Sequence, residues 1–115
     1  MSLKLIVVIR KDPTITPQPV EGLRIALGLS TGPNQLAIIM LGQARMLVAE
    51  ELSSSIKDLD TLEKYLPSIQ ELQLPIVVPE ENQQSFELDP DFSIEGKSAS
   101  EIQTLITNAD RVLIF

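Results

Sequence analysis

Four stretches of the chain are almost continuously apolar and rich in β-branched residues, as is typical of strands buried on both faces of a parallel sheet. They cover residues 3–9, 35–41, 74–78 and 111–115. A fifth stretch, 92–95, is short and partly polar, which favours an edge strand. The pattern therefore predicts five strands.

Between these strands, apolar residues recur every three or four positions, as on the buried face of a helix. A first helix is predicted to begin near Pro17, after possible hydroxyl caps at 14–16, and to end before Gly32. A shorter helix over 43–52 is predicted after a sharp turn at Gly42.

Two more helices are predicted in the second half of the chain. One spans 58–72 and contains Pro67, which predicts either a kink or a division into two short helices. The other follows residues 98–101, Ser-Ala-Ser-Glu, which match a capping box. Because strands alternate with helices, we expect one α/β domain over residues 1–115. Its architecture is predicted to be a three-layer α/β/α sandwich around a mainly parallel five-stranded sheet, with right-handed crossovers.

The composition restricts the chemistry that such a domain can perform. The 115 residues include no Cys and no His. Disulfides, thiolate zinc sites, cysteine nucleophiles and Ser-His-Asp triads are therefore excluded. The five glycines match no phosphate-binding motif. We expect that the chain is not an enzyme and that it holds no metal or cofactor.

The charges are unevenly distributed within a net charge of −7, which argues against binding to nucleic acid or to an anionic membrane. Residues 1–49 carry five cations and two carboxylates, a net +3, whereas residues 50–115 carry four cations and fourteen carboxylates, a net −10. This asymmetry fits either head-to-tail association or a solvated acidic surface. No apolar run is long enough to span a bilayer, and 5–9 resembles a strand rather than a signal peptide, so a cytoplasmic location is expected.

Ligands of open α/β sheets gather where the strands end. Arg10 and Lys11 follow the first predicted strand, and Gly42 and Arg45 follow the second. These four residues predict a small site for an anionic metabolite, helped by the amides of the helix that begins near Gly42. The alternative is that the three cations are ordinary loop charges, or that they pair with Asp12 or with acids of a neighbouring chain.

The third predicted strand leads into an acidic loop, residues 80–91. Its neighbouring carboxylates Glu80 and Glu81 have the chemistry to act as acid and base in a hydrolase or to hold a hard cation. The alternative is a solvated acidic loop, because the spacing does not match that of a calcium-binding loop.

Three segments together resemble the DsrE/DsrF-like family of small sulfur-relay subunits. Residues 3–10 with 21–29 are similar to the family's first strand and helix, and 37–45, AIIMLGQAR, resemble its second strand and the following turn. Residues 92–115, FSIEGKSASEIQTLITNADRVLIF, resemble its last strands and capped helix. The resemblance implies a five-stranded parallel sheet with helices on both faces, and homo- or hetero-oligomers that are trimers or hexamers.

The resemblance also implies a persulfide-carrying cysteine near the end of the third strand, a position that falls here on Val78 or Pro79. Neither side chain can carry sulfane sulfur, because only a thiolate forms the required S–S bond. We therefore expect a non-catalytic DsrE/DsrF-like protein that acts through assembly, as an accessory subunit beside a cysteine-bearing family member.

Overall fold

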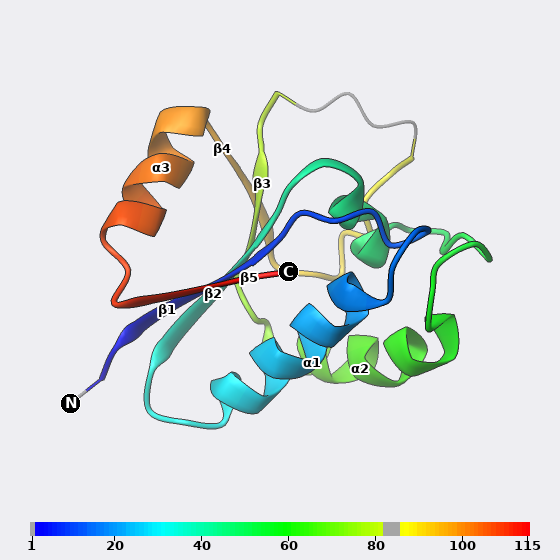
Figure 1. The fold of residues 1–115 in the computed structure, drawn as a ribbon, viewed down its shortest axis with the longest axis horizontal. Helices are drawn as coiled ribbons and strands as arrows, with labels where there is room; N and C mark the ends of the chain where they lie inside the picture. Colours follow the sequence, from blue (N-terminus) through cyan, green and yellow to red (C-terminus); the bar gives the residue numbers. More distant parts are fainter. Residues whose placement is uncertain (1, 82–85) are drawn as a thin grey trace.

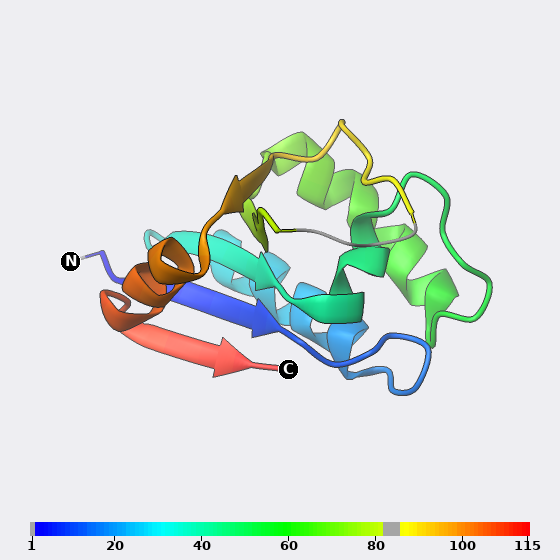
Figure 2. The same cartoon turned by 90° about the horizontal axis from the view of Figure 1, so that it is seen from above.

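The computed structural model describes residues 2–81 and 86–115, and a sheet of five parallel strands forms its centre. The strands lie in the order β4-β3-β2-β1-β5, which Figure 2 shows from above. Their bounds are Lys4–Ile9 (β1), Gln35–Met40 (β2), Ile76–Pro79 (β3), Ile94–Lys97 (β4) and Arg111–Ile114 (β5). All four neighbouring pairs are parallel, and β4 is an edge strand, as predicted.

Helices cover both faces of this sheet, so the predicted three-layer α/β/α sandwich is confirmed (Figure 1). Helices α1 (Gln18–Ser30) and α2 (Leu59–Leu72), with the short 3-10 helix η1 (Gly42–Val48), pack on one face, which we call the α1/α2 side. Helix α3 (Ala99–Thr107) packs on the other, the α3 side. Strand β1 serves both layers, because its alternate residues point to opposite faces.

The strand order explains why the two faces are covered unequally. From β1 the chain moves outward to β2 and β3, with α1 and α2 on one side of the sheet. After β4 it returns through α3, on the opposite side, to place β5 beside β1. Right-handed crossovers require this change of side when the direction reverses. The reversal point therefore lies between β1 and β5.

The α3 capping box is present as predicted. The Ser98 hydroxyl accepts a hydrogen bond from the Glu101 amide at 3.2 Å, and the Ser98 amide donates to Glu101 Oε1 at 3.1 Å. Ile102 follows as the buried residue of the helix. These bonds satisfy amides that have no partner within the first turn.

Some predicted details differ from the structure. Helix α2 continues through Pro67, so the division into two short helices is wrong. Pro67 and Glu63, whose carbonyl loses its helical partner, are both exposed, and water can solvate the freed carbonyl. Buried Leu62 and Ile69 hold the helix to the sheet on either side of the proline. The segment after Gly42 is a 3-10 helix that ends at Val48, shorter than the predicted helix over 43–52.

Helix α1 approaches the sheet closely at Gly22. A Cβ atom at this position would lie 3.1 Å from both Ile9 Cγ1 and Phe115 Cγ. Gly28, six residues later on the same helix, has open space around it.

The N-cap of α1 is Pro17, and the Thr16 hydroxyl accepts a hydrogen bond from the Gln18 amide at 3.3 Å. Among the described residues, no helix has the length and apolarity needed to cross a bilayer.

Candidate functional site

The residues predicted to form a site all lie at one edge of the sheet, where the parallel strands end. We call this the C-terminal edge. Arg10 and Lys11 follow β1, Gly42 lies two residues past the end of β2, and Val78 and Pro79 end β3. Figure 2 shows the strand arrows pointing to this edge.

Arg45 is held at the end of β2 by the turn into η1. Gly42 has a φ of 57°, in the left-handed region that glycine adopts at low cost, and its carbonyl accepts a hydrogen bond from Arg45 Nε at 2.9 Å. The Nη1 atom of Arg45 is buried and has no hydrogen-bond partner among the described residues. This burial lowers the pKa of the Arg45 guanidinium from its ordinary value. Nη1 is therefore a buried donor without a partner among those residues, and an anion reaches it only if the side chains around it move.

Arg10 and Lys11 lie at the reversal point between β1 and β5. Their backbone amides donate to the Phe115 carbonyl at 2.8 and 3.4 Å, and both residues are exposed. Asp12, the suggested partner, instead accepts hydrogen bonds from the Thr14 amide and hydroxyl at 2.9 and 2.7 Å. No hydrogen bond among the described residues joins Arg10 or Lys11 to Arg45. A single anion site formed by all of them stays a prediction.

The structure distinguishes the two positions at which the resemblance locates a cysteine. Val78 belongs to the core on the α1/α2 side and is 5% exposed. Pro79 is half-buried and lines a hollow of about 160 Å³ together with Glu80 and Glu81. The opposite wall is formed by Lys97, Ser98 and Ala99, at the start of α3. A side chain at 79 is therefore accessible from the surface, whereas one at 78 is not.

Sequence reasoning did not identify Lys97 and Ser98 as neighbours of Pro79. The parallel register pairs Pro79 with Lys97, and the Glu80 amide donates to the Lys97 carbonyl at 2.9 Å. The sequence did contain a signal for this contact. Residues that end neighbouring parallel strands meet at one edge of the sheet, the rule that located Arg10, and it applies equally to Pro79 and Lys97.

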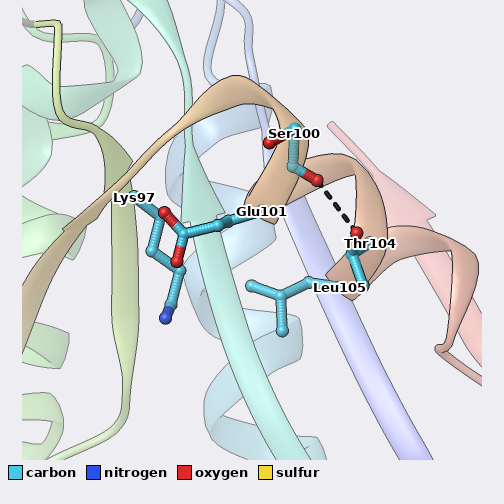
Figure 3. A pocket seen from close by; sticks show the side chains of 5 residues that line it. All are labelled: Lys97, Ser100, Glu101, Thr104 and Leu105. Carbon is cyan, nitrogen blue, oxygen red and sulfur yellow. Dashed lines mark hydrogen bonds between the residues drawn. The ribbon is translucent and has the colours of Figure 1, made fainter.

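Two of the polar residues that line this hollow, Lys97 and Ser98, already have partners. Lys97 Nζ lies 3.2 Å from Glu95 Oε1, and the hydrogen bond from the Ser98 amide lowers the pKa of Glu101. A second, shallow hollow of about 270 Å³ runs along α3 (Figure 3). There the Thr104 hydroxyl donates to the Ser100 carbonyl at 3.0 Å. At the start of α3 the capping box occupies the amides of Ser98 and Glu101, so these two are not available to an anion.

The acidic loop is partly outside the described residues, since 82–85 are not among them. Its later part is fixed to the end of η1 and the residues just after it: the Glu50 amide donates to the Glu87 carbonyl at 2.8 Å, and the Asp89 amide to the Val48 carbonyl at 2.9 Å. Within 2–81 and 86–115, no three Asp or Glu side chains gather as potential metal ligands. The hydrolase chemistry suggested for Glu80 and Glu81 stays untested.

Comparison with known proteins identifies the fold. No protein-family model and no curated protein sequence matches the chain. Among solved structures, the crystal structure of the YchN protein from E. coli matches with a TM-score of 0.75 and 16% identity, over 100% of both chains. YchN has a DsrE/DsrF-like fold, and this likeness shows that the present chain shares that fold.

Proposed function

We propose that this protein is a non-catalytic member of the DsrE/DsrF-like family that acts through assembly, as an accessory subunit of a cytoplasmic sulfur-relay complex. The observation that carries the proposal is Pro79. It is the accessible one of the two positions, Val78 and Pro79, at which the resemblance locates the persulfide-bearing cysteine, in a chain without any Cys.

The chemistry of persulfide transfer supports a non-catalytic role. A thiolate attacks the outer sulfur of a donor persulfide, an S–S bond forms on the acceptor, and the donor leaves as a thiolate. None of the side chains around Pro79 can form that bond. The sulfur would therefore be carried by a cysteine-bearing family member that binds this chain.

The test is to purify the chain with the cysteine-bearing DsrE/DsrF-like protein encoded nearest to it and measure sulfur transfer. Labelled persulfide is loaded on that protein, and its transfer to an acceptor is followed with and without the present chain. We expect co-elution of the two proteins and a changed transfer rate. A chain that binds no such protein and leaves every rate unchanged would contradict the proposal.

A second candidate function is binding of an anionic metabolite at Arg45, because its Nη1 atom lacks a hydrogen-bond partner among the described residues and would gain one from an anion. Thermal-shift measurements with sulfate, phosphate and nucleotides test it, because an anion at a hundred times its Kd adds about 2.7 kcal/mol of stability. We expect Arg45→Gln to abolish the shift and Arg24→Gln, a control on the exposed face of α1, to leave it intact. Absence of any shift, or an equal shift in both variants, would exclude the site.

A further inference from the structure

The two edges of the sheet are protected to different extents. Strand β4 has the sequence Ile-Glu-Gly-Lys, with charged side chains that discourage pairing with other strands. Strand β5 has the sequence Arg-Val-Leu-Ile, and Leu113 and Ile114 are 39% and 61% exposed. In the described part of the chain β5 pairs only with β1 (Figure 2). Its outer backbone groups and apolar side chains are therefore free to accept another strand.

The exposed side chains of β5 lie on both faces of the sheet. Ile114 pairs with Val8 and Val112 with Ile6, which places both on the α3 side. Leu113 pairs with Val7 and lies on the α1/α2 side. A partner that covered one face alone would leave the other exposed, whereas an added strand covers both.

We propose that the partner is a second copy of this chain, whose β5 pairs antiparallel with the first, so that two five-stranded sheets become continuous. With the two-fold axis at Leu113, this residue faces its own counterpart, and Val112 of each copy faces Ile114 of the other. Directly opposite residues of an antiparallel pair lie on the same face, as this register requires. Every cross-strand pair from 112 to 114 is then apolar.

Charge complementarity favours this self-pairing. Arg10 follows Val8 and Asp110 precedes Val112 at alternating strand positions, so both belong to the α3 side. They lie at opposite ends of β5, since the Asp110 amide pairs with Lys4 and the Arg10 amide with Phe115. The antiparallel register brings Asp110 of each copy near Arg10 of the other at both ends of the interface.

The outer edge of β5 is a self-association surface that the proposed accessory function does not specify. Leu113→Cys tests it directly, since the chain has no other cysteine. Under oxidised glutathione we expect Leu113→Cys to form a covalent dimer and Leu72→Cys, a control at a 55% exposed apolar residue on α2, to form none. Equal cross-linking of both variants would overturn the proposed pairing.

Native mass provides the second measurement. We expect a dimer, in place of the trimer or hexamer that the resemblance implies, for the purified chain and for Leu72→Lys, and a monomer with unchanged circular dichroism for Ile114→Lys. A purified chain that is monomeric would overturn the proposed self-pairing. An oligomer that survives Ile114→Lys would refute the β5 interface and leave the proposed accessory function standing.

Discussion

Two cysteine variants at the end of β3 test the assignment of the accessible position. Val78→Cys puts a thiol into the core, where Val78 is 5% exposed, and Pro79→Cys puts one into the hollow beside α3. Because the chain contains no other Cys, the colour released from a thiol reagent such as DTNB reports only the introduced group.

The expected difference follows from burial. To react, a thiol at 78 must first be uncovered, and exposing a side chain of valine size costs up to about 3 kcal/mol. Each 1.4 kcal/mol is a factor of about ten in population, so Val78→Cys should react more slowly than Pro79→Cys by a factor of up to about 100.

The assay normalises each rate to that of the same variant in urea, which removes differences in intrinsic reactivity. The normalised rate is measured at several pH values, because only the thiolate reacts. Equal normalised rates would show that Val78 is not covered by the α1/α2 layer. Faster reaction at 78 would reverse the assignment and make Val78 the position of the family thiol.

Three further predictions concern the helices. Gly28→Ala should stabilise the protein by about 1 kcal/mol and raise Tm by about 4 °C, because alanine favours the helix and its Cβ has open space. Gly22→Ala should give no gain, because its Cβ would lie 3.1 Å from atoms of Ile9 and Phe115. Equal Tm shifts of the two variants in calorimetry would refute this. Ser98→Ala should cost about 1 kcal/mol in urea unfolding, by loss of the α3 cap, and an unchanged midpoint would contradict the capping role. The pKa of Glu101 is lowered on folding, so its stabilisation is present above its unfolded pKa and is lost as pH falls through the folded value. The stability difference between the wild type and Glu101→Gln should therefore be constant near neutral pH and shrink below about pH 4.5; a difference unchanged at pH 3 would refute the linkage.

The strands and their layers could be predicted because the decisive signals are local. Strand β1 is apolar at successive positions, so it must be covered on both faces, and the capping box marks the start of α3 without reference to any distant residue. The continuity of α2 through Pro67 could not be predicted in the same way. It depends on Leu62 and Ile69 packing against the core on either side of the proline, which is a tertiary contact.

The site was predictable only as an edge of the sheet. Strand endings located Arg10, Arg45 and Pro79 at that edge, but their neighbours depend on register and on which face each element covers. Lys97 lies beside Pro79 because β3 and β4 pair in a particular register, and short strands such as Ile-Glu-Gly-Lys specify that register weakly. Within the described part of the chain Arg45 has a nitrogen without a partner because η1 is packed into the core, which no pattern around Arg45 indicates.

The fold places no requirement for proline at position 79. The amides of Ile76 and Glu80 donate toward β4, so by alternation the nitrogen of Pro79 faces β2. The pairing of β2 with β3 ends at Val77, and no ladder hydrogen bond is lost for want of an N–H at 79. Pro79→Cys should therefore cost less than about 1 kcal/mol, mainly through greater freedom of the unfolded chain. Urea unfolding measures this cost. A loss of several kcal/mol would make the proline a structural necessity and remove the inference that the missing thiol reflects the function of this subunit.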